Sequence, residues 1–426
     1  MEKFIALTLF ILCTNSGFAL QSQQLPDGKQ QAVSQEEEAA TDTVDLSGEE
    51  YETLPSEASA SHVLARPWYQ NIDISGFGAM WFADSGASGT RPQAGFVIKE
   101  ATLFVEAEVW EDIAFFLELQ TNPLQRDQDA KVRTGEVYMH FYNILKKWGH
   151  DLLGIKAGRI DIPFGEEYLW QDAPDNPLIS NTAAYPWLWD EGILFYGNLG
   201  RVGWVAAITD GHFVRSVEDD AEKALNAKIY STFSEDLFLS ASIMRNGATE
   251  KGPLLVGGSL FKPVGAGKGA STLGQSPSQK IDAILYALDA KYSLAPRLDL
   301  EVGVGRACID DRVDDFDRQL SWFSIQGRYE FLAERVYSAL RYSEIGTYDS
   351  AAGYQLGGEF MAGGRDFGYD AKRLQRSSLG LGWKLNPRFL CKLEVGRDRF
   401  EVIENSPFKP GADDRDFYVL EATVSF

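Results

Sequence analysis

The sequence predicts an all-β protein, specifically a transmembrane antiparallel β-barrel. Three observations lead to this prediction: period-2 alternation of apolar and polar residues, breaks that alternate between short and long, and a last strand that ends on Phe426. The composition agrees, with 40 glycines, 12% aromatic residues and a mean hydropathy of −0.22 in a chain of 426 residues. Strands that alternate apolar and polar side chains have this overall polarity even when one face contacts lipid.

The N-terminal part divides into two segments before the predicted barrel. Residues 1–19 have the pattern of an export signal, with Lys3, an apolar stretch over 4–13 and small residues up to a cleavage point after Ala19. Residues 20–66 contain ten acids and two bases with few large apolar residues, so we expect a disordered periplasmic segment. No later stretch has the roughly 18 consecutive apolar residues of a membrane helix. We therefore assign residues 67–426 to the barrel.

The breaks between strands give the strand number. Seven short breaks alternate with eight long ones, as expected for a barrel with tight periplasmic turns and larger external loops. Seven turns join fourteen strands in pairs, and a first strand near 70–82 and a last strand near 416–426 raise the number to sixteen. The runs 254–261 and 354–361 also resemble strands, and counting both as crossing strands would give eighteen. We predict sixteen, a size that leaves an aqueous channel.

Each strand has one apolar face that is suited to lipid. In the second strand Val97, Leu103 and Val105 alternate with Glu100 and Glu106, and the same pattern recurs in later strands. Aromatic residues at the ends of the runs are expected to form the interfacial girdles of the barrel. The expected girdle residues are Trp81, Trp110, Trp148, Tyr292 and Tyr342.

The last strand also predicts how the chain is recognised during assembly. Counting back by twos from Phe426 gives only apolar or aromatic residues, among them Val424, Leu420 and Tyr418. A final strand of this kind resembles the assembly signal of bacterial outer-membrane barrels. We expect these four residues to form that signal and to engage the barrel-assembly machinery, with outer-membrane lipid around the finished protein.

The third long break, residues 160–191, differs from the others in composition. It contains seven acids, no lysine or arginine, and six aromatic residues, and a loop of this length is usually functional. We predict that it narrows the channel. The expected constriction residues are Asp161, Glu166, Glu167, Asp172, Asp175 and Asp190, and the expected aromatic lining is Tyr168, Trp170, Trp187 and Trp189. Alternatively, the aromatic rings only pack the loop against the wall.

The segment Gly158-Arg-Ile-Asp-Ile-Pro-Phe-Gly-Glu-Glu-Tyr168 resembles the G-[QR]-x-x-x-PF-x-x-E segment of the phosphate-selective porin family of the O and P type. Arg341-Tyr342-Ser343, at the end of a late strand, is similar to the recurrent Arg-Tyr-Ser of that family. The resemblance covers the barrel in outline. It implies a sixteen-stranded, homotrimeric porin, integral to the bacterial outer membrane, with the N-terminal segment in the periplasm.

The charges do not support phosphate as the solute. The basic residues expected on the inward face are Lys228, Arg328, Arg341, Lys384 and Lys392. Several glutamates are expected on the same inward face, and the third loop has no base. We therefore predict a passive channel for small hydrophilic solutes or ions with a slight preference for cations. Two alternatives stay open: a specific channel for phosphate, other oxyanions or sugars, and a closed structural or adhesive barrel.

Other functional classes have little support in the sequence. After removal of the signal, Cys308 and Cys391 have no metal or disulfide spacing, and the four histidines form no metal motif. There is no phosphate-binding glycine loop and no nucleophile elbow, and His140 has no nucleophile near it in the expected strand. We expect no enzyme activity, no cofactor, no metal and no nucleic-acid partner.

Overall fold

A computed structural model describes residues 71–84, 94–121, 132–144, 153–184, 189–211, 222–249, 281–311, 318–332, 335–347, 354–356, 369–402 and 414–426. The predicted signal and acidic segments, Trp148, Trp187 and the run 254–261 lie outside these residues. Within the described residues, no helix is long and apolar enough to cross a membrane.

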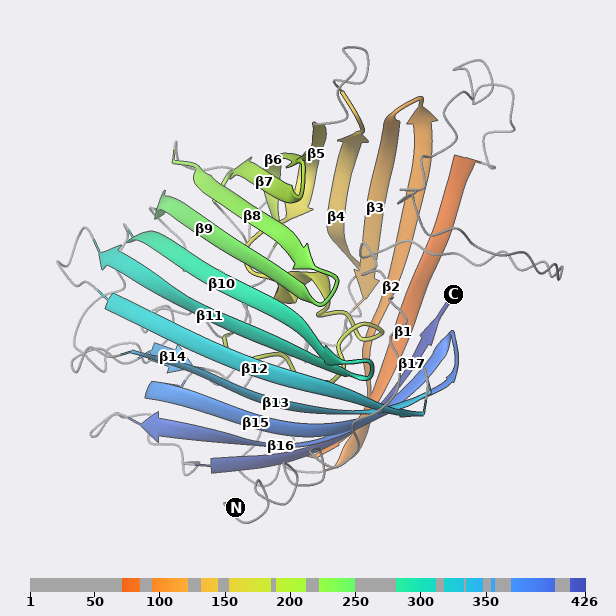
Figure 1. Ribbon diagram of the computed structural model, residues 1–426, viewed down its shortest axis with the longest axis vertical. Helices are drawn as coiled ribbons and strands as arrows, with labels where there is room; N and C mark the ends of the chain where they lie inside the picture. Colours follow the sequence, from red (N-terminus) through yellow and green to blue (C-terminus); the bar gives the residue numbers. More distant parts are fainter. Residues whose placement is uncertain are drawn as a thin grey trace, which may run out of the picture.

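The described strands form a single antiparallel sheet (Figure 1). Their bounds are β1 Ile72–Asp84, β2 Gly95–Trp110, β3 Ile113–Thr121, β4 Val132–Phe141, β5 Gly154–Asp161, β6 Trp189–Leu199, β7 Val202–Thr209, β8 Ala224–Ser234, β9 Leu237–Thr249, β10 Ile281–Ala295, β11 Leu298–Asp311, β12 Arg318–Leu332, β13 Val336–Thr347, β14 Tyr354–Leu356, β15 Tyr369–Asn386, β16 Phe389–Val402 and β17 Asp414–Ser425.

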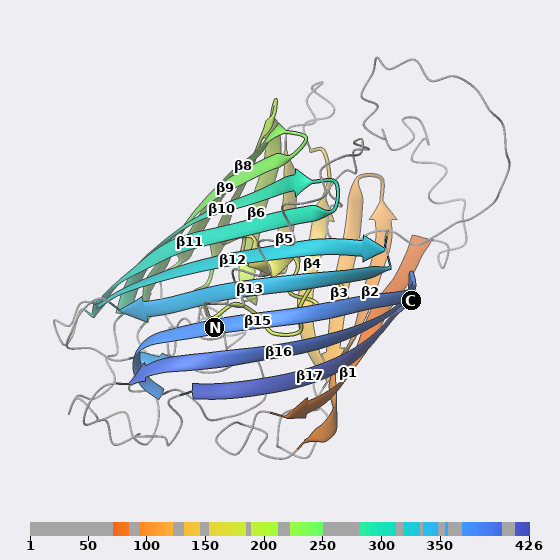
Figure 2. The same cartoon turned by 60° about the horizontal axis from the view of Figure 1, so that its bottom comes forward.

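The sheet closes into a barrel because β1 pairs with both β2 and β17 (Figure 2). The three-residue strand β14 pairs only with the start of β15, while β13 pairs directly with β15. β14 therefore extends one hairpin and is not a crossing strand. The closed barrel has sixteen strands, as the alternation of short and long breaks predicted. Closure leaves no free edge among the sixteen described crossing strands, which is the condition for a sheet in lipid.

The two faces of the strands follow the predicted alternation over most of the barrel. In β17, Tyr418, Leu420, Val424 and Phe426 are all at least 46% exposed on the outside, whereas Val419, Glu421 and Thr423 are at most 1% exposed on the inside. Large apolar side chains are likewise exposed on the outside of the other strands, for example Ile229, Leu288, Leu340 and Leu379. Trp110 and Tyr292 are exposed at strand ends, as expected for an aromatic girdle.

A β-bulge in β2 reverses the predicted faces near the start of that strand. The register between β1 and β2 shifts so that Ala79 pairs with Glu100 and Met80 with Ile98, which leaves Lys99 as an extra residue. The predictions that Val97 faces lipid and Trp81 belongs to the girdle are therefore wrong. Trp81 is 2% exposed inside the barrel, and Val97 packs against it.

Several inward aromatic rings lie flat on the wall, each over a glycine of the neighbouring strand. Five such pairs are in direct register: Gly154–Tyr196, Gly203–Tyr230, Gly305–Trp322, Gly382–Tyr337 and Gly396–Phe417. A Cβ atom at any of these glycines would collide with the partner ring. Glycine at these positions thus lets a large ring cover the backbone without extending into the lumen.

Candidate functional site: the loop inside the barrel

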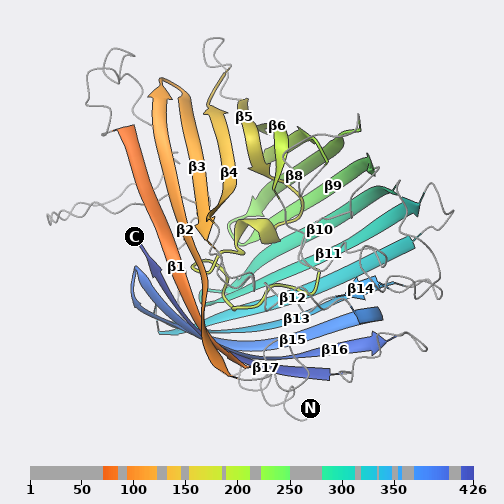
Figure 3. The ribbon, with the colours of Figure 1, turned by 180° about the vertical axis from the view of Figure 1, so that it is seen from behind.

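The chain between β5 and β6 enters the barrel (Figure 3). We call its described part, residues 162–184, the docked loop. Its only regular element among these residues is a short 3-10 helix, Glu167–Leu169. Ile162, Phe164, Ala173, Leu178, Ile179 and Ala183 are at most 3% exposed. Burial of these side chains against the wall accounts for the inward path, because each loses contact with water.

The first part of the docked loop binds β8 and β9. The Lys228 ammonium lies 2.6 Å from Glu166 Oε1 and donates to the carbonyl of Gly165 at 2.8 Å. The backbone N–H of Gly165 donates to Ser242 Oγ at 3.1 Å. Lys228 also lies 4.9 Å from the centre of the Tyr168 ring, within range of a cation–π contact. One lysine thus contacts a carboxylate, a carbonyl and an aromatic face of the loop.

The second part of the docked loop binds β16. Lys392 Nζ donates to the carbonyls of Ala173, Asn176 and Leu178 at 2.7, 3.1 and 3.0 Å. Two residues further along the same face, Glu394 accepts from the backbone N–H groups of Ile179 and Ser180 at 2.6 and 2.7 Å. Lys392 therefore donates hydrogen bonds to the carbonyls, and Glu394 accepts them from the N–H groups, of one short stretch of loop backbone. Buried peptide groups need such hydrogen-bond partners.

Two arginines complete these contacts from β13 and β15. Arg341 donates to the carbonyl of Ser180 at 2.5 Å and to Asn176 Oδ1 at 2.9 Å, and its plane faces Trp170 at 5.1 Å. Arg376 donates to the carbonyl of Asn181 at 3.0 Å and forms a two-bond pair with Asp398. Both guanidinium groups are buried, with 1% exposure each. These hydrogen bonds offset the free-energy cost of removing the two charged groups from water.

The predicted acidic residues of the loop occupy different surroundings. Glu166 and Glu167 are buried, and Glu167 accepts two hydrogen bonds from Thr182, one from its backbone N–H at 2.7 Å and one from its hydroxyl. Burial raises the pKa of Glu167, while Arg341 and the bonds from Thr182 act in the opposite direction. Asp172 is half-buried and close enough to Lys99 for their charges to interact, and Asp175 is exposed.

The other predicted residues at the ends of the loop lie in the strands. Asp190 is fully buried on the inward face of β6 and accepts from the backbone N–H of Gly211 at 2.7 Å. Asp161 pairs with Trp189, and the next pair along the two strands is the inward pair Ile160 and Asp190. Asp161 and Trp189 are therefore on the outer face of their strands. Trp189 lies under the guanidinium of Arg159, at 5.5 Å. These two residues thus belong to the rim of the barrel.

The five predicted basic residues are all at inward positions, but they divide into two groups. Lys228, Arg341 and Lys392 are at most 3% exposed and bind the docked loop. Arg328 is half-buried beside Glu330, with 2.6 Å between charged atoms, and lies over the Tyr337 ring at 4.6 Å. Lys384 is half-buried. Three of the five therefore contact the loop, and two lie elsewhere on the inner wall.

Sequence reasoning missed several residues that bind the loop or support those that do. Arg376 and Asp398 were not considered, although both continue the inward register of β15 and β16. Glu421 is fully buried and accepts from Lys392 at 2.7 Å and from the Trp81 indole at 2.6 Å. Extending the alternation of these two strands by one or two inward positions would have placed Arg376 and Asp398 inside, and the alternation counted back from Phe426 already places Glu421 on the inner face. The hydrogen bond of Arg376 to Asn181, 195 residues away in the chain, has no sequence signal.

The inward face of β2 to β4 carries a row of acids. Glu100, Glu118 and Glu136, on β2, β3 and β4, are buried inward acids. Glu118 accepts from the backbone N–H of Glu136 at 3.1 Å, and Glu136 accepts from that of Asp161 at the same distance. Lys99, the bulge residue, lies 3.0 Å from Glu100. Lys99 also lies 3.9 Å from Glu421, which Lys392 contacts at 2.7 Å, so this row of carboxylates continues around the inner wall from the residues that hold the docked loop.

The structure is thus a closed barrel of sixteen strands with an inward loop after β5. Solved structures of outer-membrane proteins share this fold. The outer membrane channel DcaP of Acinetobacter baumannii aligns with a TM-score of 0.53 at 14% identity, over 83% of this chain and 97% of that chain. OmpF of Salmonella typhi, in complex with daunomycin, aligns with a TM-score of 0.54 at 10% identity and the same coverage.

OmpT, an outer membrane protein of Vibrio cholerae, aligns with a TM-score of 0.53 at 11% identity, over 83% of this chain and 97% of that chain. A trimer form of that protein is among the similar structures. At these identities the likeness concerns the fold. No family model matches the sequence, and no curated protein matches it either. The resemblance to phosphate-selective porins is therefore not confirmed beyond the porin fold.

Proposed function

We propose that the protein is an outer-membrane channel through which small hydrophilic solutes and ions diffuse passively. The observation that carries the proposal is the docked loop, which is held inside a closed sixteen-stranded barrel by Lys228, Arg341 and Lys392. A loop fixed in this way narrows the lumen at a constant position and leaves the rest of the barrel for water. The fold shared with the A. baumannii channel supports the same conclusion.

We also propose that the channel prefers cations. The buried cations of the wall are occupied by loop carbonyls and carboxylates, so they contribute little field to the remaining aperture. In the docked loop Asp172 is half-buried and Asp175 is exposed, and Glu100, Glu118 and Glu136 are inward acids of β2, β3 and β4. Carboxylates that line the narrow part of a pore attract cations and repel anions.

The membrane context follows from the same proposal. The exposed apolar side chains around the barrel would contact outer-membrane lipid, and the exposed row from Tyr418 to Phe426 would serve the assembly machinery. A homotrimer, as in the trimer form of V. cholerae OmpT, would cover part of this outer surface. The expected export signal would deliver the chain to the periplasm before insertion.

Deleting residues 166–188 and joining the remaining ends with a short glycine linker tests the role of the loop. In planar bilayers the shortened channel should conduct several times more current per channel, with a weaker ion preference. Unchanged conductance and selectivity would show that the loop does not form the constriction. The matched control replaces the short β10–β11 turn, Pro296-Arg297, by Asn-Gly, which should leave both quantities as they are.

A closed structural barrel is the second candidate, because the docked loop touches several parts of the wall. Ala173 packs against Phe77 and Ala79 of β1, and Ile179 packs against Trp81 and Phe417. If the loop filled the whole cross-section, liposomes containing the protein would not swell in small sugars. Swelling at a rate that falls with sugar size would support the open channel and reject the closed barrel.

A further inference from the structure

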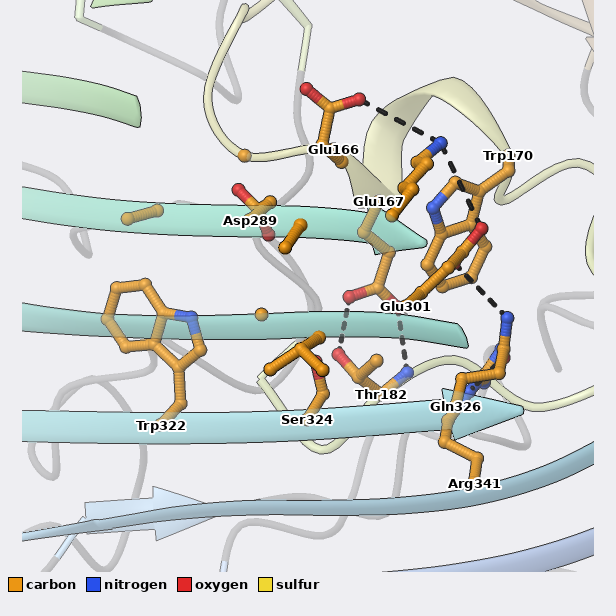
Figure 4. Close-up of a pocket in the computed structure, with 16 residues that line it drawn as sticks. Glu166, Glu167, Trp170, Thr182, Asp289, Glu301, Trp322, Ser324, Gln326 and Arg341 are labelled. Carbon is orange, nitrogen blue, oxygen red and sulfur yellow. Dashed lines mark hydrogen bonds and ion pairs between the residues drawn. The ribbon is translucent and has the colours of Figure 1, made fainter. Parts of the chain in front are cut away.

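A cavity lies between the docked loop and the wall formed by β10 to β13 (Figure 4). Its volume is about 40 Å³, which is room for about three water molecules. Glu166, Glu167 and Trp170 of the loop face Asp289, Ser324 and Trp322 of the wall across it. Lys291 and Glu301, 21% and 29% exposed, connect the cavity to the lumen.

The floor of the cavity is Gly303. This glycine pairs with Asp289 on one side and with Ser324 on the other, so the three residues form one row across β10, β11 and β12. A Cβ atom on Gly303 would lie 2.9 Å from Asp289 Oδ1 and 2.9 Å from Ser324 Oγ. The missing side chain thus leaves a space into which two oxygen atoms from neighbouring strands point.

Asp289 is the acid of this cavity that lacks a close partner. Its Oδ2 atom is buried and has no hydrogen-bond partner in the described part of the chain. The other acids are engaged: Glu166 with Lys228 at 2.6 Å, Glu167 with Thr182, and Glu301 with the Gln326 amide at 3.3 Å. Lys291 lies 3.9 Å from both Glu166 and Glu301, and no ion pair joins a described cation to Asp289. Asp289 itself is half-buried, and a carboxylate with one oxygen shielded from water and without a partner favours a counter-ion or a proton.

We propose that this cavity binds a monovalent cation of ammonium or potassium size, with Asp289 and Ser324 as the protein ligands. The carboxylate supplies the charge, the hydroxyl supplies a second oxygen, and Trp322 and Trp170 supply aromatic surface, which attracts ammonium groups. Among the described residues, no group of three His, Cys, Asp or Glu side chains is arranged to hold a metal ion, which argues against a divalent metal here. This site would place a monovalent cation at the constriction of the proposed channel. It rests on the proposed function in one respect, that cations reach the cavity from the lumen.

Thallium(I) is a suitable probe because it resembles potassium and ammonium in size and charge and scatters X-rays anomalously. Crystals of the purified full chain would be soaked in thallium(I) acetate, and anomalous difference maps would be calculated for the wild type and for Asp289→Asn. We expect a peak above Gly303 within bonding distance of Asp289 and Ser324 in the wild type, and its loss in the variant. No peak in the wild type, or an equal peak in Asp289→Asn, would overturn the proposal.

Two further variants make the test specific. Asp299→Asn removes an exposed carboxylate from the same strand pair and should leave the peak unchanged. Gly303→Ala fills the floor and should abolish the peak while Asp289 is intact; a peak that persists there would contradict the assigned position. The crystallographic result does not depend on conduction. A thallium peak in a protein that forms no channels would refute the proposed channel function and leave the cation site intact. Channels without a thallium peak would refute the cation site and leave the channel function intact.

Discussion

Two parts of the inner surface of the barrel differ in charge and in their contacts with the docked loop. The first, which we call the loop-bearing wall, is the inward face of β8–β13 and β15–β17, where the docked loop is bound. The second, the acidic wall, is the inward face of β2–β6. Among the inward side chains that the structure describes, the loop-bearing wall has equal numbers of bases and acids. The bases are Lys228, Lys291, Arg328, Arg341, Arg376, Lys384 and Lys392, and the acids are Asp289, Asp299, Glu301, Glu330, Glu394, Asp398 and Glu421.

The acidic wall has twice as many acids as bases. Its inward acids are Glu100, Glu106, Glu108, Glu118, Glu136 and Asp190, and its inward bases are Lys99, Arg133 and Lys156. This difference in charge explains how a chain can place lysines and arginines inside a barrel without forming an anion path. Most of the buried bases bind the loop, and the charge that remains towards the lumen is negative.

The largest expected effect comes from breaking the contact between the loop-bearing wall and the loop. Replacing Lys392 by Met removes the partner of three carbonyls and of the buried Glu421. Loss of one member of a buried ion pair should lower the free energy of unfolding by about 3–5 kcal/mol. Denaturant unfolding of the barrel in detergent measures this quantity. Lys384→Met, on the inward face of the neighbouring strand, is the control, and equal losses in the two variants would contradict the role given to Lys392.

An intermediate effect is expected where aromatic rings cover glycines of the wall. Gly382→Ala should destabilise the barrel by about 1–3 kcal/mol, because the new Cβ would occupy the place of the Tyr337 ring. In a Tyr337→Ala background the same substitution should cost much less. A double-mutant cycle on unfolding free energies measures this difference. Additive effects of the two substitutions would show that the ring and the glycine do not depend on each other.

A smaller effect is expected from neutralising the acidic wall. Glu100→Gln combined with Glu118→Gln removes two buried charges from the acidic wall. The preference for potassium over chloride should fall by an amount equivalent to about 1 kcal/mol. Reversal potentials in a potassium chloride gradient measure this change. Glu330→Gln, on the loop-bearing wall beside Arg328, should have less effect, and an equal shift from it would remove the distinction between the two walls.

Much of the fold could be predicted from the sequence, because each barrel strand carries its own alternation of lipid-facing and inward residues. The even strand number followed from the alternation of short and long breaks. The bulge at Lys99 could not be predicted, since one extra residue is defined only by pairing with β1. Val97 and Trp81 were misplaced for that reason.

The candidate site could be predicted only in part. The composition of 160–191 indicated a functional loop, and strand alternation placed Lys228, Arg341 and Lys392 inside. Which wall the loop would bind was not accessible, because contacts such as that of Glu394 with Ser180 join residues 214 positions apart. The sequence likewise gave no reason to link Asp289, Gly303 and Ser324, which become one row only through the register of β10, β11 and β12.

The central claim is that the loop occupies the buried bases and leaves a cation-preferring aperture. The most direct test is the zero-current potential of the purified protein in a planar bilayer across a potassium chloride gradient. The account predicts a potential of cation-selective sign that decreases when Glu100 and Glu118 are neutralised. A potential of anion-selective sign would contradict it, because the bases of the loop-bearing wall would then determine the field at the narrowest point.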